Sequence, residues 1–146
     1  MEIRFTKHRF IELATPRSLT SHETQVLQLL VRGSEAADCQ VVRATVAEEC
    51  VDRCGSLVMA VPRGACGQIL SSKRLLANAE WRYGNEGADV QDVLLFVDDG
   101  FLSLIETYRG DGEVPRGLPK VADLTILLGP DGPTPWPDTR STQPDV

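Results

Sequence analysis

The stretch "LLFVDDGFLSLIETYRG", residues 94–110, places two apolar runs on either side of Asp98, Asp99 and Gly100. An Asp-Gly dipeptide is favoured in two-residue hairpin loops, because both loop positions need a positive φ that glycine accepts freely and aspartate tolerates. We therefore predict strands at 92–97 and 101–108, joined by a tight turn. With this loop the facing pairs are Val97–Leu102, Leu95–Leu104 and Val93–Glu106, which groups Val93, Leu95, Val97, Leu102 and Leu104 on one face.

The clearest helix signal lies near the N-terminus. Thr20 followed by Glu23 has the form of a capping box, in which each side chain accepts a hydrogen bond from the other residue's backbone N–H. An apolar stripe at helical spacing follows, and Gly33 suits the position after a helix end. The pattern predicts a helix over 20–32, with the stripe formed by Val26, Leu27, Leu30 and Val31.

The rest of the chain is predicted to form mainly short strands. Alternating or β-rich runs predict strands at 39–48, 56–61 and 79–84. Residues 1–17 fit a short strand or an extended arm, and residues 67–78 fit either a helix or a loop. The expected fold is α+β, with one N-terminal helix packed on an antiparallel meander sheet of four to five strands.

Length and composition fit one domain. The 146 residues can bury a real core, and we place a single domain at 1–128. Residues 129–146 hold five of the nine prolines and little to bury, so they are expected to form a flexible tail. No apolar run approaches the length of a membrane span, and the N-terminus has no secretory signal pattern. A cytoplasmic location without membrane association is therefore expected.

The charge of the chain is unevenly distributed. The formal net charge is −6, and residues 86–113 hold eight acidic residues against the single basic Arg109. An acidic face repels phosphate backbones, so nucleic-acid binding is disfavoured. The same charge favours a basic protein partner.

The four cysteines leave three interpretations open. A hairpin over 39–66 centred near Asp52 would place Cys50 opposite Cys54 and Cys39 near Cys66, which permits two disulfides or one split metal site. The spacing lacks the paired C-x2-C knuckles of zinc ribbons and the C-x2-C of thioredoxins. Free thiols are the favoured interpretation, because a reducing cytosol disfavours disulfides.

Catalytic signatures are missing from the sequence. There is no phosphate-binding G-x-x-x-x-G-K-[ST] loop, no G-x-G-x-x-G fingerprint and no G-x-S-x-G context. Nothing places His8 or His22 beside a thiol, and nothing singles out an acid–base pair among the strand carboxylates. We predict no catalytic residue, no metal site and no cofactor.

Residues 80–119, "EWRYGNEGADVQDVLLFVDDGFLSLIETYRGDGEVPRGLP", are similar to the C-terminal half of small uncharacterised bacterial α+β proteins. The shared features are a strand, the DDG turn, a strand with a Leu-x-x-Ile-Glu core at Leu102–Glu106, a polar turn at Gly110–Gly112 and the close at Leu118-Pro119. Some proteins of this look resemble immunity proteins of bacterial toxin systems. The resemblance implies tight binding to a cognate toxin.

The leading hypothesis is therefore a protein-binding module without chemistry of its own, immunity-like or antitoxin-like, that blocks a basic toxin. A small ligand-binding domain or enzyme with a pocket between sheet and helix is one alternative. A structural protein that forms a homodimer through an exposed edge strand is another. The residues expected to bind the partner are Asp98, Asp99, Glu106, Asp111 and Glu113, and those expected to line the alternative pocket are Glu80, Trp81, Arg82, Tyr83 and Phe96.

Overall fold

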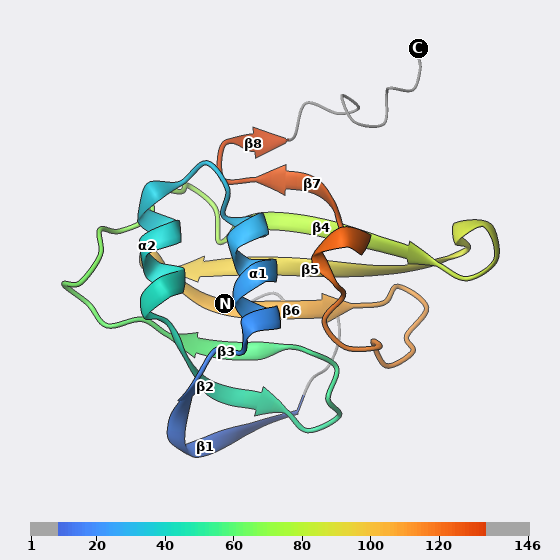
Figure 1. The fold of residues 1–146 in the computed structure, drawn as a ribbon, viewed down its shortest axis with the longest axis horizontal. Helices are drawn as coiled ribbons and strands as arrows, with labels where there is room; N and C mark the ends of the chain where they lie inside the picture. The colour runs from blue at the N-terminus through green and yellow to red at the C-terminus, as the bar shows by residue number, and fades with distance from the viewer. Residues whose placement is uncertain (1–8, 134–146) are drawn as a thin grey trace.

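A computed structural model describes residues 9–133 and shows two helices on one face of an antiparallel sheet (Figure 1). Within these residues the strand order is β1-β2-β3-β6-β5-β4-β7-β8, and every neighbouring pair is antiparallel. The α+β class predicted from the sequence is confirmed. The elements are β1 Phe10–Ser18, α1 Ser21–Leu30, α2 Glu35–Arg43, β2 Thr45–Cys50, β3 Leu57–Ala60, β4 Leu75–Tyr83, the 3-10 turn η1 Asn85–Gly87, β5 Asp89–Asp98, β6 Phe101–Tyr108, the 3-10 turn η2 Val121–Asp123, β7 Thr125–Gly129 and β8 Gly132–Pro133.

Helix α1 forms as the capping pattern predicts. The Glu23 N–H donates to the Thr20 hydroxyl at 3.1 Å, and the Thr20 N–H donates to the Glu23 carboxylate at 2.8 Å. The apolar stripe of the helix is buried against the sheet, where each large aliphatic side chain contributes roughly 1.5–3 kcal/mol. These two features together fix where α1 begins and which face it turns to the sheet.

The second helix corrects the prediction of a strand over 39–48. Ser34 caps α2 by accepting a hydrogen bond from the Ala37 N–H, and Ala37, Gln40 and Val41 are buried at helical spacing. Only from Thr45 does the chain extend into β2. The prediction grouped Val41, Ala44 and Val46 in one strand on a period of two, although Val41 lies in α2 and Val46 in β2.

The sheet is larger than the four to five strands expected. Strand β1 extends the sheet at one edge, and the β7–β8 hairpin extends it at the other (Figure 1). Residues 129–133, which the sequence assigned to the tail, belong to this hairpin. Residues 134–146 of that tail, and residues 1–8 of the N-terminal segment, lie outside the described residues. The ambiguous segment 67–78 is an irregular loop up to Arg74, and β4 then begins at Leu75.

The β5–β6 hairpin contains a β-bulge that changes its faces. Val97 pairs with Leu102 as predicted, but Phe96 pairs with Leu104, so Ser103 is an extra residue in β6. One inserted residue reverses the faces of all that follow it. Consequently Ile105, not Leu104, joins the core beneath the helices, and Leu95 and Val93 face Ile105 and Thr107 instead of Leu104 and Glu106.

The two faces of the sheet carry separate apolar groups. The larger core lies between the sheet and both helices, and it includes the fully buried Leu27, Leu30 and Ile105. A smaller group on the opposite face contains Leu94, Phe96 and Leu104, packed against Phe10, Val58, Leu75 and Tyr108.

Candidate functional site

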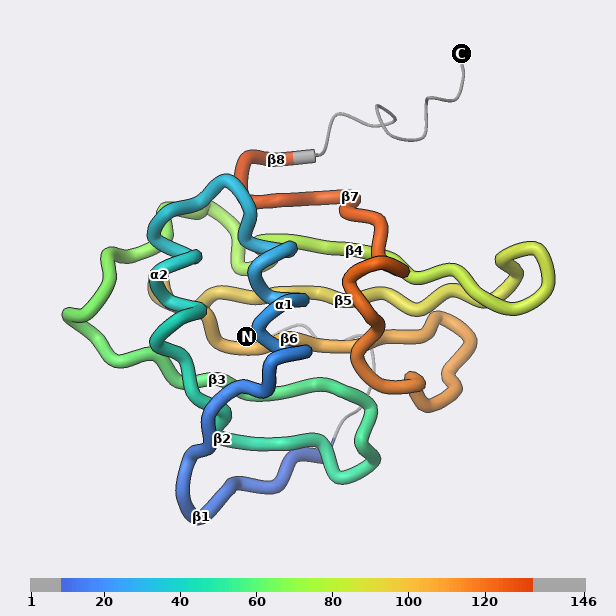
Figure 2. Tube along the Cα trace, viewed as in Figure 1, coloured from blue at the N-terminus to red at the C-terminus, as the bar shows by residue number. Residues whose placement is uncertain are grey.

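The turn between β5 and β6 has the predicted hairpin geometry. Asp99 has φ 54° and Gly100 has φ 81°, so both loop residues are in the left-handed region. Asp98 pairs with Phe101 at the last step of the ladder. The two aspartates are therefore part of a tight turn at the end of the sheet that α2 covers (Figure 2).

Gln40 of α2 holds this turn in place through side-chain hydrogen bonds to backbone groups. Its fully buried side-chain amide donates to the carbonyl oxygens of Gly67 at 2.9 Å and Gly100 at 3.0 Å. Its carbonyl oxygen accepts a hydrogen bond from the Leu102 N–H at 2.9 Å. One side chain thus joins α2, the segment after β3 and the first residues of β6.

The segment 61–74 between β3 and β4, here called the contact loop, packs directly against the turn. The Ile69 N–H donates to the Gly100 carbonyl at 2.8 Å, and the Gln68 amide donates to the Asp99 carbonyl at 3.1 Å. Ile69 is buried in the main core, whereas the next residue, Leu70, is 94% exposed. The backbone of the contact loop is therefore anchored, while the apolar side chain of Leu70 lies in solvent.

A disulfide ties the contact loop to α2. Cys39 in the helix and Cys66 in the loop are bonded, with their Cα atoms 5.9 Å apart. The favoured prediction of free thiols is wrong for this pair. The two cysteines are close, as a hairpin over 39–66 would have placed them, but Cys39 lies in helix α2 and not in a strand of that hairpin. Helix α2 fixes the contact loop twice, through the disulfide and through the neighbouring Gln40.

Between the contact loop and the turn lies an open hollow of about 350 Å³. Its rim is charged, because Asp98, Asp99 and Lys73 are all exposed. Asp99 forms an ion pair with Arg63 at 3.2 Å, whereas Asp98 has no ion-pair partner within residues 9–133. The lining residues are Gln68, Ile69, Leu70, Ser71, Ser72, Lys73, Arg74, Val97, Asp98, Asp99 and Gly100.

The structure does not bring the five predicted partner-binding carboxylates together. Asp98 and Asp99 precede β6, whereas Asp111 and Glu113 follow it, so the eight-residue strand separates the two pairs by its whole length. Glu106 is fully buried within β6. The sequence grouped them as one acidic surface because they are close along the chain, but a strand carries its two ends to opposite edges of the molecule (Figure 2).

The Asp111 carboxylate is bound by the neighbouring Arg109 side chain. Arg109 donates two hydrogen bonds to its carboxylate, and these lower the pKa of Asp111 below the usual value. The Asp111 carboxylate also accepts a hydrogen bond from the Glu113 N–H at 3.0 Å. These contacts stabilise the loop after β6. Of the predicted carboxylates, Asp98 and Asp99 are the ones that lie beside the exposed Leu70.

The residues predicted to line a pocket are divided between the two faces of the sheet. The rings of Trp81 and Tyr83 lie 4.1 Å apart on the helix side, where Arg116 stacks over Tyr83 at 4.7 Å. Glu80 and Arg82 point to the opposite face, as strand alternation requires, and are ion-paired at 2.9 Å. Phe96 belongs to the small apolar group on that opposite face. The five side chains do not converge on one cavity.

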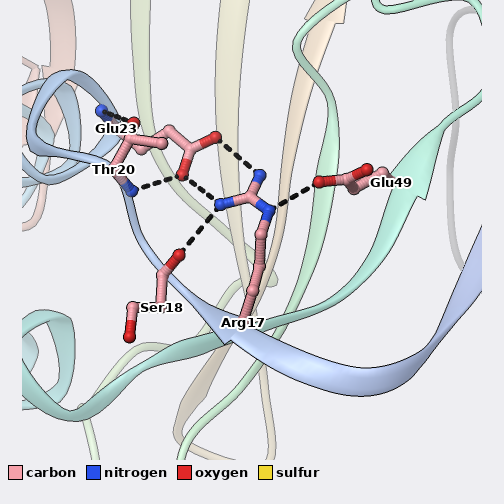
Figure 3. Close-up of polar contacts among 5 residues, drawn as sticks. All are labelled: Arg17, Ser18, Thr20, Glu23 and Glu49. Carbon is pink, nitrogen blue, oxygen red and sulfur yellow. Dashed lines mark hydrogen bonds and ion pairs between the residues drawn. The ribbon is translucent and has the colours of Figure 1, made fainter.

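A second charged group, centred on Arg17, was not found from the sequence (Figure 3). The Arg17 guanidinium donates to both carboxylate oxygens of Glu23 at 3.0 Å, to Glu49 at 2.5 Å and to the Ser18 carbonyl at 2.9 Å. Burial alone would raise the pKa of Glu23, but hydrogen bonds from Arg17 and the Thr20 N–H lower it below the usual value. These contacts join β1, α1 and β2, so we interpret the group as structural.

In residues 9–133, no group of three His, Cys, Asp or Glu side chains is arranged to hold a metal ion. His22 contacts the Pro119 carbonyl at 2.9 Å, and His8 lies outside the described range. No helix in the described part of the chain is long and apolar enough to cross a membrane.

No protein-family model, no curated protein and no solved structure matches this chain. The resemblance of residues 80–119 to immunity proteins therefore stays a prediction.

Proposed function

We propose that the protein is a non-enzymatic binding module that recognises a protein partner through the contact loop and the β5–β6 turn. The observation that carries the proposal is the exposure of Leu70, at 94%, on a backbone held by the disulfide, by Gln40 and by the Ile69–Gly100 hydrogen bond. An anchored loop loses little conformational freedom when a partner binds, so more of the contact energy appears as affinity.

The charges beside Leu70 indicate the chemistry of the partner. Asp98 is exposed at the rim of the hollow, and the chain carries a net charge of −6. A partner with an apolar pocket for Leu70 and a basic group for Asp98 fits this surface, and opposite charges would accelerate association. A basic toxin blocked by an immunity-like protein has this chemistry, and it is the partner class that we propose.

A ligand-binding or enzymatic pocket between sheet and helices has less support. Leu27 and Leu30 of α1 fill that space together with Ile105 of the sheet, and all three are fully buried. Self-association through an edge strand remains the alternative that the experiments below distinguish.

The experiment uses affinity capture from the native cells with matched variants of the full chain. Leu70→Ser removes the proposed anchor, and Val114→Ser removes another exposed aliphatic side chain, 57% exposed, from the opposite end of the sheet. We expect a protein recovered with the wild type and with Val114→Ser to be recovered at least tenfold less with Leu70→Ser. Asp98→Asn should leave the fold intact and weaken capture mainly at low salt.

Two results would contradict the proposal. One is equal recovery of every captured protein by the two serine variants, and the other is the absence of any captured protein at low and moderate salt. Light scattering that shows a dimer in the wild type and a monomer after an edge-strand substitution in β1 would favour self-association instead.

The proposed location is cytoplasmic, and the disulfide provides a separate test of it. Disulfides are rare in a reducing cytosol. Alkylation of thiols in intact cells, before lysis, measures whether Cys39 and Cys66 are bonded in place. A fully bonded pair would argue against the cytoplasmic proposal, whereas a reduced pair would leave Gln40 and the Ile69–Gly100 hydrogen bond to hold the contact loop.

A further inference from the structure

A second pair of cysteines lies at the opposite end of the β2–β3 hairpin from the disulfide. Cys50 ends β2 and Cys54 lies in the turn that follows, and they are only 7% and 1% exposed. The two sulfur atoms are 2.9 Å apart, with the Cys54 thiol directed at the Cys50 sulfur. No disulfide joins them in this structure.

Backbone contacts hold the two thiols in this position. The Arg53 N–H donates to the Cys50 carbonyl at 3.1 Å and closes the turn, while Arg53 and Gly55 adopt φ values of 57° and 95°. The Cys54 carbonyl accepts a hydrogen bond from the Thr107 hydroxyl of β6 at 2.7 Å. The pairing of the two sulfurs is therefore imposed by the fold, and bringing them together costs no further chain entropy.

We propose that Cys50 and Cys54 are a peroxide-oxidisable dithiol that forms a second disulfide, nested inside the Cys39–Cys66 loop. The Cys50 thiolate attacks hydrogen peroxide, an S–O bond forms, the O–O bond breaks, and the departing hydroxide takes the thiol proton to give water. The Cys54 sulfur then attacks the sulfenic sulfur of Cys50. The S–S bond forms, the S–O bond breaks, and a second water leaves, so two thiols are oxidised by two electrons and one peroxide is reduced.

Cys50 is placed as the first nucleophile because it is the more exposed of the two. A small oxidant is needed, since burial excludes a bulky disulfide reagent from both sulfurs. This assignment is independent of the proposed binding surface, which lies at the other end of the sheet.

Formation of the Cys50–Cys54 disulfide would also stabilise the neighbouring loop. Gly55 packs so tightly on the chain after β6 that a Cβ atom added to it would lie 2.6 Å from the Leu118 nitrogen. A ring closed at Cys50 and Cys54 fixes the turn that carries Gly55. The oxidised protein should therefore have a higher melting temperature than the reduced dithiol form.

The test treats the full chain, purified with its Cys39–Cys66 disulfide intact, with hydrogen peroxide. Alkylation under denaturing conditions should count two thiols per chain before treatment and none after it. Peptide mapping should identify a Cys50–Cys54 crosslink, and a dithiol reductant should restore both thiols. In Cys54→Ser, peroxide should instead leave a sulfenic acid at Cys50 that dimedone traps.

Three outcomes would overturn the proposal. Two thiols that remain alkylatable after peroxide would show that the pair is inert, and an unchanged dimedone signal in Cys54→Ser would remove Cys50 as the nucleophile. A crosslink that joins either residue to Cys39 or Cys66 would show disulfide exchange rather than a second bond.

Discussion

Replacing Gln40 with alanine tests whether one buried amide fixes the turn and the contact loop. The change removes hydrogen bonds to the Gly67 carbonyl, the Gly100 carbonyl and the Leu102 N–H. Gly100 keeps its bond from the Ile69 N–H, but the Leu102 N–H and the Gly67 carbonyl lose a partner inside the protein. With a net cost of about 1 kcal/mol for each bond, we expect a loss of about 3 kcal/mol.

The loss should be visible by two measurements. For a chain of this length, 3 kcal/mol corresponds to a decrease of about 10 °C in melting temperature. Hydrogen exchange should accelerate at the Leu102 amide more than at amides in the middle of β5. Gln28→Ala is the matched control, because Gln28 is an exposed glutamine in α1 and its replacement should change stability by less than about 0.5 kcal/mol.

The reasoning would be refuted by a Gln40→Ala variant whose stability lies within about 1 kcal/mol of Gln28→Ala. The reasoning would also be refuted if the Leu102 amide kept its full protection from hydrogen exchange in the Gln40→Ala variant. Either result would mean that water or a shifted loop replaces the amide without loss, and that Gln40 does not hold the contact loop.

Three further substitutions test the turn, the Arg17 group and the disulfide. Gly100→Val should destabilise by about 2–4 kcal/mol in a urea titration, because φ is 81° and an added Cβ would lie 2.8 Å from the Gln68 Cβ; an unchanged midpoint would contradict the turn. The pKa of Glu23 is lowered in the folded state, so its contribution is present near neutral pH and is lost as pH falls through the folded pKa. The stability difference between wild type and Glu23→Gln should therefore shrink as pH falls below the ordinary glutamate pKa and through the lowered folded pKa, and an equal difference at every pH would exclude the Arg17 pair as its source. Cys39→Ser opens a disulfide of sequence separation 27 and should cost about 3 kcal/mol; a thermal scan that matches the wild type would show that the bond constrains nothing.

The sequence predicted the elements whose signals are local. The capping box at Thr20 and Glu23 and the turn at Asp99-Gly100 each depend on residues within four positions of one another, and both are confirmed. The bulge at Ser103 was not predicted, because Leu104 and Ile105 are both apolar and the sequence alone does not show which of them faces the helices. Its effect was large, since it exchanged the faces of Leu104 and Ile105.

The candidate site was harder to predict because its rigidity depends on contacts between distant residues. Gln40 lies sixty positions before Gly100, and a buried glutamine has no periodic signal that separates it from an exposed one. The sequence found the acidic turn and the proximity of Cys39 to Cys66, but it took α2 as a strand and so could not connect them. Once α2 is a helix, Cys39 and Gln40 are adjacent residues that hold one loop. Because of these contacts, the backbone that carries the exposed Leu70 is anchored. The binding proposal therefore depends on Gln40 and the disulfide as much as on Leu70.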